Sequence, residues 1–580
     1  MNKWFKIFIF FFLIIVIGLG VAYQATQKAK PPVKQIFINA TVLTMNSTNA
    51  IVQAIAVDND TIVAVGSNQE IKLLIDEDTL IHDLEGKTLL PGFVDAHSHF
   101  PGLATGKLTV DLNSPPIGDI DSIKHIITRL QANISTIKEG KWLIGVGYDD
   151  SLLKENRHVN RDDLDRVSST VPILLLHVSG HVVAVNSLGL ELTGLEISGQ
   201  DQKIVAPKGG RFVRDDAGRL TGVIEETARF DALELAFDLS LFDFIDMVEQ
   251  GAQEYAAVGV TTAQSGLSKE GQIKGFNIID KLGLIPQRLV IWPDIDTGKR
   301  WLSGEFSDES YNSDNVTIGA VKLVADGSIQ AYTGFLSSPY HKHATGYGEH
   351  SEPDYKGYPS IEQQQLEQVI VELHQKGLQV AVHANGDAAI EMVINAVKKA
   401  QTLTPRPDAR HIIIHSQMAT TNQLERMKVW GITPSFFSSH TYYWGDRHRD
   451  IFMGPERSQR ISPAKSATDI GLRFSIHLDT PVVPMNPLFG VWSAVNRITS
   501  SGQQLGLNER VSVMQALRSV TIDAAWQMFL DKKTGSLEVG KKADLVILAK
   551  NPLLQPTTLD KIDVLETYVA GLNIYTAPSR

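Results

Sequence analysis

The chain of 580 residues contains no cysteine. This absence excludes disulfides, thiolate metal sites, cysteine nucleophiles, iron–sulfur clusters and lipid attachment to a cysteine. Any metal ion must therefore be held by His, Asp, Glu or modified Lys side chains. Positive charge is not in excess either, because 54 Lys and Arg stand against 65 Asp and Glu and give a formal net charge of −11. We expect no nucleic-acid partner, since the sequence lacks a basic surface for phosphates.

Long apolar runs are also rare, and the one of membrane-spanning length lies at the start of the chain. Residues 7–23 are apolar without interruption, and Lys3 and Lys6 precede them. This pattern is typical of a secretory signal or a membrane anchor, whereas the terminal position and the missing polar face argue against a buried core helix. We predict a signal peptide or anchoring hydrophobic helix over residues 1–30. The body is then membrane-anchored or secreted, outside the cytoplasm and periplasmic in a bacterium, with cleavage left open.

The rest of the chain has an ordinary globular composition, with 21% charged and 43% hydrophobic residues. Both of its ends contain short runs rich in β-branched and apolar residues, at 35–45, 54–57 and 61–65 and again at 544–548, 564–569 and 573–575. Neither end is large enough to bury a core by itself. We therefore predict one composite β-sandwich from residues 31–90 plus 532–580, with residues 91–531 forming a single body between them.

In this body, short apolar runs alternate with amphipathic helical stretches. Continuous apolar strands that are each followed by a helix are typical of a parallel sheet with covered faces. Eight such runs predict an α/β fold, a closed (β/α)8 TIM-like barrel, although a doubly wound open sheet has the same periodicity. The predicted strands are 89–97, 172–178, 260–264, 319–325, 378–383, 411–415, 432–437 and 472–477.

Polar side chains stand at the ends of several predicted strands. In a parallel barrel the carboxyl ends of the strands meet at one mouth, where active sites lie. Two histidines at i and i+2 point to the same face of a strand, so both can reach one ion. Nitrogen ligands combined with a carboxylate suit Zn²⁺ and similar divalent ions. The predicted ligands are His97, His99, His383, His415 and Asp479.

Lys322 lies inside the fourth predicted strand, where a charged and unpaired lysine is costly to bury. It could pair with Asp326, or its ammonium could extend to the barrel mouth. Alternatively, a carbamylated Lys322 would carry a carboxylate-like group that bridges two metal ions. These residues alone leave the alternatives open.

Four motifs then resemble a known family. Residues 90–99 (LPGFVDAHSH) are similar to the first metal motif of the amidohydrolase superfamily. Residues 321–328 (VKLVADGS), 382–387 (VHANGD) and 535–545 (GSLEVGKKADL) resemble its amidohydrolase-3 branch, which includes N-substituted formamide deformylases. The resemblance extends over about residues 35–575.

Carried over residue by residue, the resemblance implies that His97 and His99 bind the more buried metal. Carbamylated Lys322 bridges to a second ion held by the histidines of the fifth and sixth strands. Asp479 is then the remaining ligand and the proton shuttle. The implied activity is hydrolysis of a non-peptide C–N bond in a small amide-like molecule, with one or two divalent ions, zinc in the first place.

Two positions depart from the family pattern. Ile414 stands where an acidic residue usually precedes the sixth-strand histidine, which alters the groups that orient His415. His477 and Leu478 stand where a small residue usually precedes the final aspartate. His477 is therefore either an extra ligand or a neighbour of Asp479.

The same branch carries the segment 180–187 (GHVVAVNS). His181 within it is a predicted catalytic residue that polarises or holds the substrate carbonyl, or else a helix-capping histidine. Two other functions remain compatible with the sequence. One is ester or lactone hydrolysis at the same metal site, because the fold does not fix the leaving group. The other is a catalytically silent, membrane-tethered protein in regulation or envelope assembly, since some relatives are described as regulators of exoenzyme production.

Overall fold

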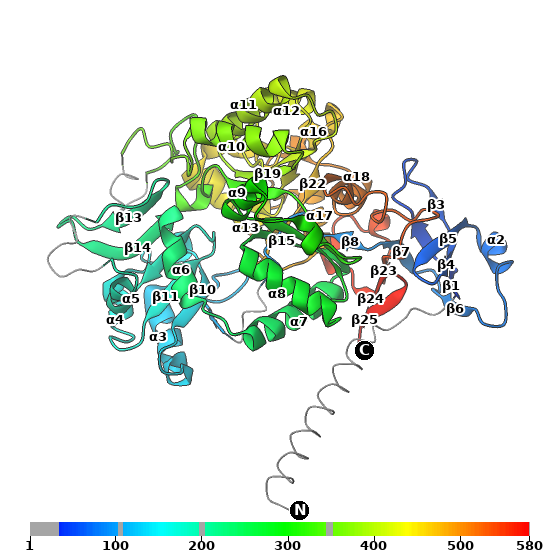
Figure 1. The fold of residues 1–580 in the computed structure, drawn as a ribbon, viewed down its shortest axis with the longest axis horizontal. Coiled ribbons are helices and arrows are strands. Elements are labelled where there is room, and N and C mark those ends of the chain that lie inside the picture. The colour runs from blue at the N-terminus through cyan, green and yellow to red at the C-terminus, as the bar shows by residue number, and fades with distance from the viewer. Residues whose placement is uncertain (1–33, 103–107, 196–203, 344–351, 579–580) are drawn as a thin grey trace, which may run out of the picture.

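The computed structural model describes residues 34–102, 108–195, 204–343 and 352–578. The predicted hydrophobic segment 1–30 lies outside the described residues. Among the described residues, no helix combines the length and the apolar character needed to cross a membrane. Figure 1 shows a central barrel, with one β-rich lobe built from the two chain ends and another inserted lobe on the opposite side.

The barrel is built from parallel strands that, in the described residues, occupy eight positions around a ring. The strand order is β17-β16-β15-β8 in one sheet and β18-β19-β20-β21-β22 in the other. The ring closes where the Asp479 N–H donates to the His97 carbonyl at 3.2 Å and the His99 N–H donates to the Thr480 carbonyl at 2.7 Å. The strands are β8 (Phe93–Val94), β15 (Val260–Ser268), β16 (Arg288–Pro293), β17 (Val316–Ile318), β18 (Val321–Val324), β19 (Val380–Ala384), β20 (His411–His415), β21 (Ile432–Phe436) and β22 (Ser475–Ile476).

Strands β17 and β18 are two halves of one barrel strand. Beyond β17, the Gly319 N–H still donates to Ile291 of β16 at 2.8 Å, and at β18 the Val321 N–H donates to Gln379 at 2.9 Å. The predicted run 319–325 thus covers the second half, which carries Lys322. The TIM-barrel-like fold is confirmed by this closed parallel ring.

Helices cover the outside of the barrel. In α10, Leu366, Val369, Ile370 and Leu373 are buried, a spacing that places them on one helical face toward the sheet. The described covering helices are α7 (Leu241–Ala257), α8 (Glu270–Lys281), α9 (Ile295–Ser303), α10 (Gln363–Gln375), α11 (Asp387–Leu403), α12 (Thr421–Val429), α16 (Ala464–Asp469), α17 (Pro487–Asn496) and α18 (Val513–Ser519).

One predicted barrel strand is wrong. The run 172–178 forms β11 (Ile173–His177) in a separate six-stranded sheet of order β13-β14-β12-β11-β10-β9, inserted between β8 and β15. A central strand of such a sheet is as continuously apolar as a barrel strand, so the pattern cannot separate them. The other strands of this sheet are β9 (Val110–Asp111), β10 (Leu143–Tyr148), β12 (Val182–Val185), β13 (Gly210–Arg214) and β14 (Leu220–Glu226).

The barrel position that the prediction missed is β16. Its sequence begins with Arg288 and ends with Pro293, two residues that disfavour a buried strand. Arg288 is buried because its guanidinium forms a bidentate pair with Asp544, with Nε–Oδ2 and Nη2–Oδ1 distances of 2.8 and 3.1 Å. A paired arginine can thus begin a central strand, and this pair ties the barrel to the C-terminal segment.

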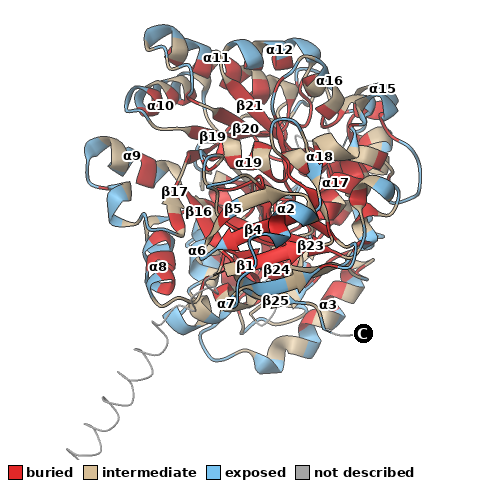
Figure 2. Cartoon of the chain, turned by 90° about the vertical axis from the view of Figure 1, so that its right-hand side faces the viewer, coloured by how far each residue is buried: buried red, intermediate tan, exposed pale blue. Residues whose placement is uncertain are grey.

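The two chain ends form two further sheets. One has the order β5-β4-β1-β6, and the other, β25-β24-β23-β7-β2-β3, combines strands from both ends. Phe37, Val57 and Leu545 belong to one apolar cluster between the sheets, and the Gln35 side chain donates to the Gly571 carbonyl at 2.8 Å across 536 residues. Figure 2 shows the buried strands of both sheets together. The strands are β1 (Lys34–Ile38), β2 (Thr41–Leu43), β3 (Ile51–Val52), β4 (Ala54–Asp58), β5 (Thr61–Gly66), β6 (Leu80–Asp83), β7 (Thr88–Pro91), β23 (Leu545–Leu548), β24 (Val564–Val569) and β25 (Leu572–Thr576). The domain limits 31–90 plus 532–580 and 91–531 stay predictions.

Gly92 marks the passage from the terminal sheet into the barrel and divides the predicted run 89–97 into β7 and β8. A Cβ at Gly92 would lie 2.1 Å from Cγ2 of Thr261, so no side chain fits there. We expect Gly92→Ala to lower the free energy of unfolding by about 1–3 kcal/mol, as overpacking does. Chemical denaturation measures this change.

Gly271 in α8 is the matched control, because a Cβ there meets nothing within 4 Å. Gly271→Ala should leave stability unchanged or raise it by up to about 1 kcal/mol, since alanine favours helix. Equal stability of the two variants would contradict the steric role of Gly92.

Candidate metal centre

Three of the predicted ligands, His97, His99 and Asp479, meet beyond the end of β8. The Oδ1 atom of Asp479 lies 3.4 Å from Nε2 of both His97 and His99. This oxygen is buried and accepts no hydrogen bond from any described residue. An orphaned carboxylate oxygen that faces two imidazole nitrogens fits a bound cation.

Strand β15 orients both of these histidines. Nδ1 of His97 lies 3.0 Å from the Gln264 side-chain oxygen, and Nδ1 of His99 lies 3.1 Å from the Gly266 carbonyl. Because both partners are acceptors, each Nδ1 carries the proton and each Nε2 is left with a lone pair that can bind a metal ion. Gln264 was not predicted as a site residue, and its only signal in the sequence is an amide at the end of an apolar run.

The other predicted ligands lie beside this group. Nζ of Lys322 is 3.1 Å from Nε2 of His97. Nε2 of His415 is 2.9 Å from Nδ1 of His383 and 3.9 Å from Oδ2 of Asp479. Nε2 of His383 faces the Gly327 carbonyl at 3.1 Å. The structure thus brings all six predicted ligands together in one cluster, in which His99 is half-buried and the other five are buried.

Lys322 neither pairs with Asp326 nor extends its ammonium to the barrel mouth. Asp326 accepts hydrogen bonds from the backbone N–H groups of Asn385, Gly386 and Phe335. In the described part of the chain it forms no ion pair with Lys322. The lysine is only 3% exposed, so its ammonium does not extend to solvent. Burial lowers the pKa of its amine to about 7. A large fraction of the amine is therefore neutral near physiological pH, the form that reacts with carbon dioxide.

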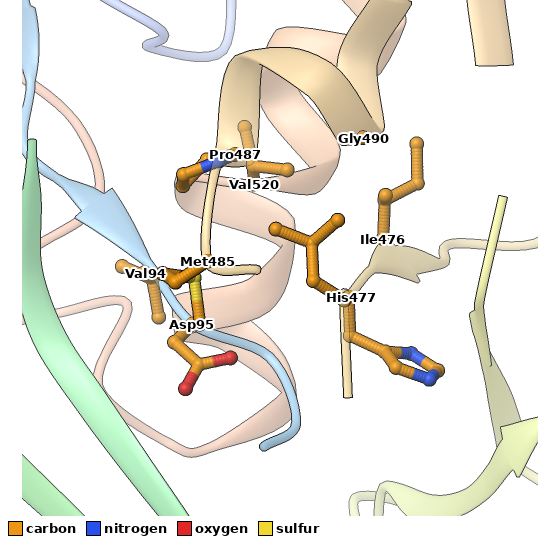
Figure 3. Close-up of a pocket in the computed structure, with 9 residues that line it drawn as sticks. Val94, Asp95, Ile476, His477, Met485, Pro487, Gly490 and Val520 are labelled. Carbon is orange, nitrogen blue, oxygen red and sulfur yellow. The ribbon is translucent and has the colours of Figure 1, made fainter. Parts of the chain in front are cut away.

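The two departures from the family pattern, Ile414 and His477, both affect how His415 is oriented. Ile414 packs in an apolar cluster, and it cannot orient His415. His477 takes that part, because its Nε2 lies 3.1 Å from Nδ1 of His415 while its Nδ1 faces the Ser435 hydroxyl at 2.9 Å. Figure 3 shows His477 and Asp95 at the ends of neighbouring strands, with the ring and the carboxylate directed to the same side.

His181 immediately precedes β12 of the inserted sheet. Its Nδ1 is 2.8 Å from Oε2 of Glu226, and its ring centroid is 4.8 Å from that of His383. The helix-capping alternative is wrong, because Asn186 caps the next helix, α5 (Ser187–Leu192). The inserted sheet thus places a histidine beside the metal-ligand cluster.

A family model for the amidohydrolase family matches residues 81–575. The chain belongs to the amidohydrolase family. Membership makes it a metal-dependent hydrolase of α/β fold.

Individual proteins also resemble the chain over most of its length. It is 27% identical to the N-substituted formamide deformylase of Arthrobacter pascens over 550 residues, which cover 93% of this chain and 98% of that one. It is 25% identical to the exoenzymes regulatory protein AepA of Pectobacterium carotovorum over 66% of this chain and 80% of that one. The crystal structure of a metal-dependent hydrolase from Pyrococcus horikoshii shares the fold, with a TM-score of 0.71, 23% identity and coverage of 90% and 98%.

Electrostatics in this amidohydrolase favour metal binding by the clustered side chains. Burial lowers the pKa values of His97, His383 and His415 well below the ordinary range. The histidines are therefore neutral, as ligands must be. Burial alone would raise the pKa of Asp479, but the neighbouring histidines hold it well below its usual value and keep the carboxylate ionised.

The backbone of this amidohydrolase is unusual at two of the candidate ligands. His415 and Asp479 have φ angles of 71° and 56°, a region that non-glycine residues rarely adopt. Such conformations are retained where the surrounding structure enforces them, typically at functional sites.

Proposed function

We propose that this amidohydrolase hydrolyses a non-peptide C–N bond in a small amide-like molecule. The observation that carries the proposal is the buried Oδ1 of Asp479, which has no hydrogen-bond partner among the described residues and faces Nε2 of His97 and His99. The similarity to an N-substituted formamide deformylase over 98% of that protein supports the choice of an amide-like bond.

The donor set fits one or two divalent ions, with zinc in the first place. His97, His99 and Asp479 would hold one ion, and His383 and His415 would hold a second, with carbamylated Lys322 between them. Bound metal supplies Lewis acidity, which lowers the pKa of water from 15.7 to about 7 and polarises a carbonyl oxygen.

The residues of the chain manage the proton. Asp479 is ionised and lies at the centre of the cluster, so its carboxylate accepts a proton from the attacking water. The same carboxyl group then gives this proton to the leaving nitrogen, which departs as an amine. His181 contacts the substrate from the side of His383.

Matched N-alkyl formamides and alkyl formates test the bond class. We expect the zinc-loaded full chain to hydrolyse the amide with kcat/KM at least tenfold above that for the ester, relative to the uncatalysed rates, and chelation to remove both activities. Turnover of the ester alone would assign an esterase or lactonase. No turnover of either substrate by fully metal-loaded protein would favour a silent regulatory or envelope protein.

The cellular setting is a further part of the proposal. The predicted signal or anchor segment 1–30 would anchor the protein in a membrane or direct its secretion, and the catalytic body would work outside the cytoplasm on a small molecule. Digestion of the protein by added protease, compared between spheroplasts and intact cells, shows on which side of the membrane the body lies. Full protection of the body in spheroplasts would contradict an extracytoplasmic location.

A further inference from the structure

Two histidines meet at the amino ends of the barrel strands, opposite the ends that carry the candidate ligands. His411 is the first residue of β20, and His374 lies in the last turn of α10. Nδ1 of His374 is 2.8 Å from Nε2 of His411, and the two residues are 0% and 1% exposed. The pair therefore joins a covering helix to a barrel strand in a place that solvent does not reach.

Backbone groups on both sides of the pair fix which ring nitrogens carry protons. The Val380 N–H, at the start of β19, donates to Nδ1 of His411 at 3.1 Å, so the ring proton of His411 lies on Nε2. Nε2 of His374 lies 2.7 Å from the Thr404 carbonyl, which can only accept, so this nitrogen is a donor. The contact between the rings then runs from Nε2 of His411 to Nδ1 of His374. Both rings are neutral in this chain of hydrogen bonds.

The same chain has no acceptor for a further proton. On Nδ1 of His411 the proton would face the Val380 N–H, and on Nδ1 of His374 it would face the N–H of His411. Either position sets two donors against each other in a buried site, so proton uptake breaks at least one hydrogen bond. In agreement with this, burial lowers the pKa of His411 to about 3 and also lowers the pKa of His374.

The charge beside the pair also opposes proton uptake. Arg406 donates to the His374 and Leu378 carbonyls at 2.8 and 2.9 Å, and its charge lowers the pKa of both rings. Asp408, on the same connection between α11 and β20, pairs with Arg410 instead. Within the described residues, α9, α11 and β19 contribute no charge to either ring, and no carboxylate offsets that of Arg406.

We propose that the His374–His411 pair is an acid-sensitive lock that holds the end of α10 and the connection 404–410 against the start of β19 and β20. Above pH 6.5, about the pKa of an unperturbed histidine, the closed pair keeps its full stability. As the pH falls from there toward 3, an opened pair takes up protons that the closed pair cannot hold, so this stability is lost. The same two strands carry His383 and His415 near their other ends, so opening loosens two of the candidate ligands.

Hydrogen exchange of the Val380 amide in the full chain tests the lock, because this N–H is bonded to His411. After correction for the intrinsic effect of pH, we expect its equilibrium constant for opening to rise by roughly 25-fold or more from pH 7 to pH 5, the effect of at least one histidine that titrates only when open. Over α12, which contains no histidine, the constant should change by less than about threefold. An unchanged constant at Val380, or an equal rise over α12, overturns the proposal.

A double variant, His374→Gln with His411→Asn, replaces both rings by neutral amides. The Oδ1 atom of the asparagine can accept the Val380 N–H, and the Nε2 atom of the glutamine can donate to the Thr404 carbonyl. The rise at Val380 from pH 7 to pH 5 should then fall to within about threefold, because neither side chain takes up a proton. A rise as large as that of the wild type overturns the proposal. If the variant does not fold, the wild-type comparison of Val380 with α12 still decides.

His343→Gln is the control for the loss of a histidine elsewhere, because His343 is exposed. This variant should keep the wild-type rise at Val380. Loss of the rise in both variants would overturn a specific role for the buried pair. The measurement needs no turnover, so the lock and the proposed hydrolysis of an amide stand or fall separately.

Discussion

Asp479→Asn is expected to lower kcat by about 10²- to 10⁴-fold while the fold is retained. The amide side chain has nearly the same shape as the carboxylate, but it cannot accept the proton of the attacking water. It also removes the negative charge that faces Nε2 of His97 and His99 at 3.4 Å. Steady-state kinetics measure the loss, and thermal unfolding of metal-loaded protein reports whether the fold is kept.

Asp280→Asn is the control for a buried aspartate outside the cluster. Its carboxylate lies on α8 and accepts a hydrogen bond from the Ser313 hydroxyl at 2.8 Å. Turnover by this variant should stay within about twofold of wild type, because the hydrogen bond between Asp280 and Ser313 involves none of the candidate ligands. Near-normal turnover by Asp479→Asn would refute the assignment of the proton shuttle.

Lys322→Ala is expected to halve the metal content and to abolish turnover. Elemental analysis of zinc-loaded protein should give about two ions per wild-type chain and about one in the variant. The reason is the position of Nζ, 3.1 Å from Nε2 of His97 and buried among the other ligands, where a carbamate would join the two ions. Loss of a bridging ligand removes the more weakly held ion first.

Lys533→Ala provides the comparison with another partly buried lysine, whose Nζ donates to the Asp314 carbonyl at 2.6 Å outside the cluster. Its metal content should equal that of wild type. One ion in both wild type and Lys322→Ala would keep a hydrolase but remove the bridging role of Lys322. No ion after careful loading would contradict the metal centre.

The location of the candidate ligands could be read from the sequence because each is encoded locally. His383 and His415 each stand near the end of an apolar run that has the pattern of a buried strand. The carboxyl ends of parallel strands converge whatever the loops contain. The pattern of His97 and His99 likewise needs no distant partner to be recognised. Their roles as ligands stay predictions until metal is measured.

The features that the sequence did not reveal all depend on long-range pairing. The run 172–178 has the apolar pattern of a barrel strand, and only its hydrogen bonds with β10 and β12 assign it to the inserted sheet. Arg288 begins a barrel strand because Asp544, far away in sequence, neutralises it. Glu226 contacts His181 because β12 pairs with β14, and no local sequence motif predicts this pairing.

The sheet that joins the two chain ends has a consequence for biosynthesis. Gln35 contacts a residue 536 positions further along the chain. One edge of β7 pairs with β2, but its other edge stays unpaired until β23 has been synthesised. At roughly 5–20 residues per second, the ribosome adds the C-terminal strands about half a minute to two minutes after the first strands emerge. An unpaired, apolar edge is exposed for that time, and such edges aggregate. Nascent chains of this enzyme should therefore depend on a holding chaperone until the last strands are released.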